Sequence, residues 1–154
     1  MALELSGTVH IPAPRAVVWA ALNTPETLRA CIPGCQELEP LSGTELRAVV
    51  VGRVGPLKAR FRGIVTLSEQ IVPDSYRISG EGEGGLAGFA RGGAQVRLTE
   101  TAAGTKLEYT AEAQIGGKIA RLGQRLVAGA AKKMADAFFR NVASAVGGEP
   151  VHRS

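Results

Sequence analysis

The chain has 154 residues and a net charge of +4, which is the size of one ordinary domain. Hydrophobic residues make up 45% and charged residues 21%, values that exclude a disordered or low-complexity protein. Two cysteines exclude a disulfide framework, and no apolar run approaches the roughly 18–20 residues of a membrane-spanning helix. The start of the chain has no basic-then-apolar leader, so we expect a cytoplasmic protein.

Basic residues are concentrated toward the end of the chain. Residues 101–154 carry eight lysines and arginines against four acidic residues. Such an excess suits an anionic membrane surface, an acidic partner or nucleic acid. Seven aromatic residues leave few platforms for base stacking, and no nucleic-acid motif is present, so we expect no nucleic-acid partner.

The first part of the chain predicts a strand followed by two short helices. Apolar and polar residues alternate over residues 3–11, the period of a half-buried strand, and prolines follow directly. A short helix is expected over residues 16–22. Thr24 and Pro25 then supply an N-cap and a first-turn proline for a second short helix, which Pro33 and Gly34 end.

Residues 36–115 predict six further strands. Turn signals divide this region at Ser42-Gly43, Gly55-Pro56, Pro73-Asp74 and Ala103-Gly104 and along the glycine-rich residues 80–85. Between the turns apolar residues alternate with polar ones, most clearly over residues 57–67 and 107–115. This pattern is typical of antiparallel strands with one face in water, so the other face needs a cover.

The predicted cover is a long helix from Lys118 to about Val146. Its basic residues fall on one arc and its apolar residues on the opposite arc. We therefore expect an α+β domain over residues 1–146, in which an antiparallel seven-stranded sheet wraps around a long C-terminal α-helix, with two short helices after the first strand. Residues 147–154 are expected to form a short flexible tail.

The inward-facing side chains of the predicted sheet are small. They are Ala48, Gly52, Ala59, Gly63, Ala94, Ala111 and Ala113. Small residues facing small residues leave either close backbone approach or a cavity, and we favour a cavity that holds a ligand. Its predicted walls are Phe61, Val65, Phe89, Val96, Tyr109, Ala111, Leu126, Ala130, Met134, Phe138 and Asn141. Tyr109 and Asn141 are the polar members, and either could instead bond within the core.

No residues in the sequence form a recognisable catalytic or metal site. His10 is predicted on the outer face of the first strand and His152 lies in the tail, so neither serves a nucleophile. Cys31 and Cys35 have no further ligands that would complete a zinc site. We expect no catalytic residue, no metal and no covalently bound cofactor.

The basic arc of the predicted helix also has apolar neighbours. It is either a solvated face or a surface that contacts a membrane or a partner protein. The residues of such a contact surface are predicted to be Lys118, Arg121, Leu122, Arg125, Lys132 and Phe139.

Three segments together resemble the G-subunit family of carbon monoxide dehydrogenase: residues 30–35 (ACIPGC), 84–90 (GGLAGFA) and 116–125 (GGKIARLGQR). The resemblance covers roughly residues 1–145, and Phe138-Phe139 fits it too. It implies a helix-grip, START-like fold of the SRPBCC superfamily, in agreement with the predicted order of elements. It also implies a non-catalytic accessory protein of the molybdenum-containing aerobic carbon monoxide dehydrogenase system.

The same resemblance implies that a hydrophobic quinone or lipid binds in the cavity, and that the protein helps membrane recruitment or electron handover. The expected partners are a carbon monoxide dehydrogenase or related molybdenum hydroxylase, and peripherally the inner face of the cell membrane. Two alternatives stay open. One is an assembly or docking protein with a filled core and no ligand. The other is a cyclase- or hydrolase-type enzyme on the same fold, which needs an acid–base pair in the cavity.

Overall fold

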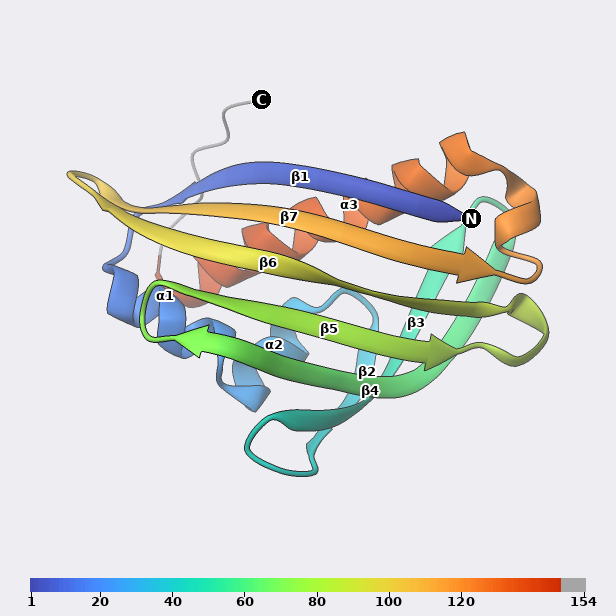
Figure 1. The fold of residues 1–154 in the computed structure, drawn as a ribbon, viewed down its shortest axis with the longest axis horizontal. Coiled ribbons are helices and arrows are strands. Elements are labelled where there is room, and N and C mark those ends of the chain that lie inside the picture. Colours follow the sequence, from blue (N-terminus) through green and yellow to red (C-terminus); the bar gives the residue numbers. More distant parts are fainter. Residues whose placement is uncertain (148–154) are drawn as a thin grey trace.

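The computed structural model describes residues 1–147, which form one sheet, three α-helices and two short 3₁₀ turns (Figure 1). In chain order the elements are β1 (Ala2–Ile11), α1 (Arg15–Leu22), α2 (Pro25–Cys31), β2 (Cys35–Pro40), β3 (Glu45–Val54), β4 (Leu57–Ile71), β5 (Ser75–Glu83), η1 (Gly85–Ala87), β6 (Phe89–Thr101), β7 (Gly104–Gly116), η2 (Ala120–Leu122) and α3 (Gln124–Ala145).

The seven strands form a single antiparallel sheet in the order β1-β7-β6-β5-β4-β3-β2. Strands 2 to 7 are joined as successive neighbours, and β1 pairs with β7, where Leu5 lies opposite Ala111. The helix α3 runs behind the sheet, and α1 and α2 lie toward one end of it (Figure 1). The predicted α+β class and seven-stranded antiparallel sheet are therefore confirmed. The division into residues 1–146 and a tail stays a prediction, since residues 148–154 lie outside the described part.

The long helix begins later than its sequence pattern predicts. Residues 118–122 form a turn and the 3₁₀ segment η2 (Ala120–Leu122) instead of the first turns of the helix, and α3 starts at Gln124. Gly123 has a φ of 97°, a left-handed conformation that glycine adopts without a steric penalty. This residue turns the chain between η2 and α3, so the predicted helix start at Lys118 is wrong by one and a half turns.

The gap between sheet and helix is filled with aromatic side chains at the α1 end. Tyr109 stacks on Phe139 with ring centroids 4.7 Å apart, and Trp19 meets Tyr76 edge-on at 5.5 Å. All four side chains are buried, together with Val142 and other apolar residues from β1, β6 and β7. Burial raises the pKa of the Tyr76 phenol because the charged form loses its hydration. Close packing at this end leaves no room for a ligand.

Candidate ligand-binding cavity

A cavity of about 410 Å³ lies between the sheet and the first half of α3, in the opposite part of the gap from the aromatic core. The sheet contributes apolar wall residues from β3 and β4: Val50, Val54, Leu57, Ala59, Phe61 and Val65. The helix contributes Val127, Ala130, Ala131 and Met134. The residues of one apolar cluster, among them Leu3, Ala87 and Ile119, close this end of the molecule.

Small side chains keep the cavity open. Of the seven inward-facing small residues, Ala48, Gly52, Ala59, Gly63 and Ala113 line it, whereas Ala94 and Ala111 do not. On the helix, Ala130 and Ala131 face the same space. Because small residues lie on both walls, space remains between them that large side chains would fill in an ordinary core.

The chemistry of the walls favours an apolar ligand. Among the lining residues only Arg53 and Glu81 are charged, and both are exposed to solvent. Within residues 1–147 no ionisable side chain is buried inside the cavity, so the interior offers apolar contact and backbone groups alone. Removing apolar surface from water contributes about 25 cal/mol per Å², so walls of this chemistry match apolar molecules better than polar ones.

The cavity reaches the surface between β3 and α3. Met134 lines it and is 40% exposed, and Arg53 lines it from the exposed end of β3. The edge strand β2 pairs with β3 only as far as Val50, so it does not cover the last residues of β3. The margin of the cavity at the end of β3 is therefore not covered by β2.

Four of the predicted wall residues line the cavity: Phe61, Val65, Ala130 and Met134. Four others, Val96, Tyr109, Ala111 and Phe138, belong to the aromatic core or pack against it. They lie on the predicted inner surfaces, but at the filled end of the gap. Burial also raises the pKa of Tyr109, whose ring stacks on Phe139.

The three remaining predicted wall residues lie elsewhere. Phe89 is 41% exposed at the start of β6, where Arg91 lies over its ring at 5.7 Å. Leu126 is also 41% exposed, next to Gly55 of the β3–β4 hairpin. Asn141 donates a hydrogen bond from Nδ2 to the backbone oxygen of Cys31 at 2.9 Å. These three predictions are corrected: none of the side chains faces the cavity.

The Asn141 hydrogen bond ties α3 to the end of α2. We expect Asn141→Ala to lower the free energy of unfolding by about 1–2 kcal/mol, because the buried partner carbonyl loses its donor. Chemical denaturation of the variant and the wild type measures the difference. Asn23→Ala is the matched control, since the Asn23 side chain follows α1, donates to Trp19 within it and accepts from the exposed Gln70. Equal stability of Asn141→Ala and the wild type would contradict the expectation.

Several lining residues were not predicted. Leu57 shares the alternation that correctly placed Phe61 and Val65, so the strand pattern already contained it. Ile32 lies at the end of α2 and Ile119 before η2. Ile32 belongs to no periodic segment, so no pattern in the sequence marks it, whereas Ile119 fits the helical pattern of the residues that follow it.

Only part of the predicted contact surface is exposed in the structure. Lys118, Arg121 and Arg125 are exposed, as expected, whereas Leu122 is half-buried against the cluster that closes the cavity end. Lys132 Nζ pairs with Asp136 at 2.6 Å. Phe139 is only 5% exposed, so its assignment to the surface is wrong. It is buried because its ring stacks on Tyr109 of β7 and lies in the aromatic core.

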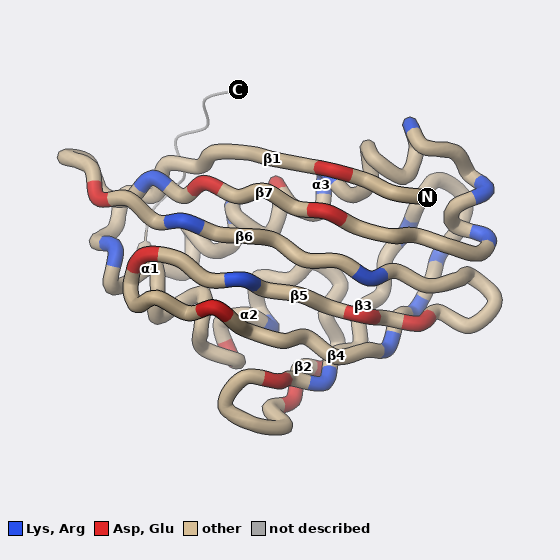
Figure 2. Tube along the Cα trace, viewed as in Figure 1, with Lys and Arg blue, Asp and Glu red and all other residues tan. Residues whose placement is uncertain are grey.

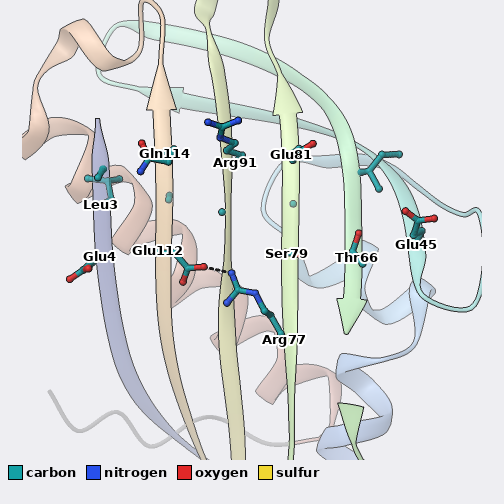
Figure 3. Close-up of a pocket in the computed structure, with 15 residues that line it drawn as sticks. Leu3, Glu4, Glu45, Thr66, Arg77, Ser79, Glu81, Arg91, Glu112 and Gln114 are labelled. Atoms are coloured by element: carbon teal, nitrogen blue, oxygen red, sulfur yellow. Dashed lines mark hydrogen bonds and ion pairs between the residues drawn. The ribbon is translucent and has the colours of Figure 1, made fainter. Parts of the chain in front are cut away.

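A second, broader hollow lies on the outer face of the sheet (Figure 3). Most of its lining side chains are polar or charged, and Arg77 on β5 reaches across to pair with Glu112 on β7. Glu4, Glu81 and Arg91 point from the same face into solvent (Figure 3). Exposed ion pairs of this kind contribute little and leave the surface solvated, so we do not assign a ligand to it.

The cysteines and histidines do not come together. Cys31 is buried and Cys35 half-buried, both with free thiols, and burial raises the pKa of each. Within residues 1–147 no group of three metal-ligating side chains forms. His10 lies on the outer face of β1, and His152 is outside the described residues. The helices of this described part include none with the length and hydrophobicity needed to cross a membrane.

Comparisons with solved structures identify the fold. A conserved protein from Geobacillus kaustophilus is 30% identical, with a TM-score of 0.88 over 94% of this chain and 95% of that one. A START superfamily protein from Mycobacterium smegmatis is 14% identical, with a TM-score of 0.70 over 93% and 96%. The Zhui aromatase/cyclase from Streptomyces sp. R1128 is 14% identical, with a TM-score of 0.69 over 96% and 99%. The last two share the fold alone, which is the helix-grip, START-like fold.

The comparison with protein families gives one match. The family described as the G subunit of carbon monoxide dehydrogenase (CoxG) matches residues 7–147, nearly the whole chain. A comparison with the curated proteins found no match.

Proposed function

Because the chain belongs to the CoxG family of carbon monoxide dehydrogenase, we propose that it is a non-catalytic accessory protein of a carbon monoxide dehydrogenase that carries a hydrophobic quinone or lipid in its cavity. The family name implies the association with the dehydrogenase. The ligand, its handover and the recruitment of the enzyme to a membrane are the parts that we add.

The observation that carries the proposal is the apolar cavity itself. The docking alternative predicts a filled core, which does not match a space of about 410 Å³ beside the well-packed aromatic core. Met134 lines the cavity and is 40% exposed, so a long apolar tail would leave beside it while the ring or chain end stays inside. A quinone or a lipid has this shape.

The family relationship and the walls of the cavity support a non-catalytic role. The family relationship points to an accessory protein, although an aromatase/cyclase shares the fold. General acid–base chemistry needs titratable groups within reach of the substrate. The charged lining residues Arg53 and Glu81 are exposed at the margin of the cavity, and no interior lining residue of the described chain is ionisable.

The handover is tested by reconstitution. We expect purified dehydrogenase supplied with carbon monoxide to reduce a long-tailed quinone faster when this protein is present, as followed by quinone absorbance. The control is the protein with its cavity filled by Ala130→Phe, which should not accelerate the reaction. Acceleration by both forms would favour the docking alternative, in which the protein acts on the enzyme without carrying a ligand.

A further inference from the structure

Three loops meet at the cavity end of the molecule. They are the β3–β4 hairpin (residues 53–58), the segment around η1 (residues 83–89) and the segment around η2 (residues 116–125). These three segments together are called the basic end. The backbone nitrogen of Ile119 donates to the oxygen of Ala87 at 3.0 Å, which joins the second loop to the third. Gly55 of the hairpin lies against Leu126 at the start of α3. The loops therefore form one continuous surface.

The charge of the basic end is strongly one-sided. Its segments contain five basic residues, Arg53, Lys58, Lys118, Arg121 and Arg125, and a single acidic residue, Glu83. All five basic residues are exposed, and none of them is in an ion pair within residues 1–147. Figure 2 shows lysine and arginine gathered where η2, the start of α3 and the nearby part of β4 lie.

The opposite end of the sheet has the reverse charge. Its turns, residues 12–15, 69–75 and 99–104, hold one basic residue against three acidic ones. The molecule is therefore electrically polar along the strands. Near an anionic surface, this asymmetry turns the basic end toward that surface.

The basic end also presents an unusually exposed leucine. Leu86 is 85% exposed at the tip of η1, between Gly85 and Gly88, which have φ values of 59° and 119°. The loop is held in place through Ala87, which is buried in the cluster below. An apolar side chain projecting from among exposed basic residues matches the boundary between anionic head groups and acyl chains.

We propose that the basic end docks on an anionic lipid bilayer, with Leu86 entering the interface and the basic residues on the head groups. The inference rests on the proposed function, since a carrier of a lipid-soluble ligand has to meet the bilayer that holds it. The surface differs from the helical arc indicated by the sequence, in which Lys132 is paired and Phe139 is buried. Docking by this end places the cavity next to the membrane.

Vesicle binding tests the proposal. We expect the wild-type protein to co-sediment with vesicles of phosphatidylcholine mixed with phosphatidylglycerol, much less with pure phosphatidylcholine, and less at high salt. Arg121→Glu should weaken binding at least about five-fold, and the triple reversal of Lys118, Arg121 and Arg125 at least about a hundred-fold. Arg97→Glu is the matched control, because it makes the same charge change on an exposed residue of β6 outside the basic end.

The role of Leu86 is tested by a second pair of variants. Leu86→Ser should weaken vesicle binding about ten-fold, because the apolar side chain no longer leaves water. Ile71→Ser should have no effect, since Ile71 is 62% exposed at the opposite end. Leu86→Trp gives an independent readout, a blue shift of the emission on anionic vesicles that Ile71→Trp does not show.

Three outcomes would overturn the proposal. The first is equal binding of the wild-type protein to both kinds of vesicle, and the second is unchanged vesicle binding by both Leu86→Ser and Arg121→Glu. The third is no vesicle binding by the wild-type protein together with lost binding of the dehydrogenase by Arg121→Glu. The last outcome would make the basic end a surface for an acidic protein. Vesicle binding is measured on ligand-free protein, so an empty cavity would refute the carrier function without affecting this test.

Discussion

Replacing Ala130 with phenylalanine is expected to lower the affinity for the apolar ligand about ten- to a hundred-fold while the protein still folds. Ala130 lines the cavity from α3, so the new ring occupies the space that the ligand needs. Forcing such bulk aside costs about 1–3 kcal/mol, which corresponds to this loss of affinity. Titration with a fluorescent lipid or a quinone measures the change.

The matched control for this variant is Gly129→Phe. Gly129 is the preceding residue of the helix, is exposed, and has nothing within 4 Å of an added Cβ atom. The same ring therefore enters the helix but stays outside the cavity, and affinity should not change. If both variants bound the ligand as the wild type does, the ligand would occupy some other site.

Replacing Gly63 with alanine is expected to lower the free energy of unfolding by about 3 kcal/mol or more. A Cβ atom on Gly63 would lie 1.7 Å from the backbone oxygen of Glu81 on the neighbouring strand. Because that oxygen belongs to backbone within the sheet, the collision is relieved only by moving β4 away from β5. Urea denaturation monitored by circular dichroism measures the effect.

Gly82, which is paired with Gly63 on β5, provides the control. A Cβ atom there would lie 3.5 Å from the Cβ atom of Phe61, an ordinary contact. Gly82→Ala should therefore change the free energy of unfolding by less than about 1 kcal/mol. Equal losses in the two variants would mean that glycine is needed in this sheet for flexibility and not for close approach.

The sheet could be predicted from the sequence because its signal is local. Alternation fixes which residues of a strand share a face, and Phe61 and Val65, which it predicts on the inner face, line the cavity. Phe89 was misplaced although the same rule applies. Following the alternation of Ala94 and Val96 back through two glycines puts residue 89 on the outer face, where the structure has it.

The position of the cavity along the sheet could not be predicted. Small residues line both halves of the inner face, as Ala94 and Ala111 show, but the half near α1 is filled by Trp19 and by Tyr109 on Phe139. Which half stays empty depends on where α1 and the end of α3 pack, and those contacts join residues far apart in the chain. The same packing buries Phe139, although the helical pattern predicts it on the surface.

The break before the long helix is also hidden from periodicity. Lys118 to Leu122 fit the helical pattern of the following residues, yet Gly123 turns the chain with a φ of 97°. As a result η2 lies at the end of the sheet, where Ile119 bonds to Ala87 and closes the cavity. The basic residues of this segment therefore belong to an end of the molecule and not to one helix face.

The most direct test of the carrier function is native mass spectrometry of the protein purified gently from cells that contain quinones, followed by organic extraction of anything bound. The cavity predicts a quinone or lipid in a one-to-one complex, released by extraction and absent from the Ala130→Phe variant. A protein of unchanged mass, which stays free of ligand after incubation with long-tailed quinones and lipids, would contradict the account and leave a docking protein with an empty cavity.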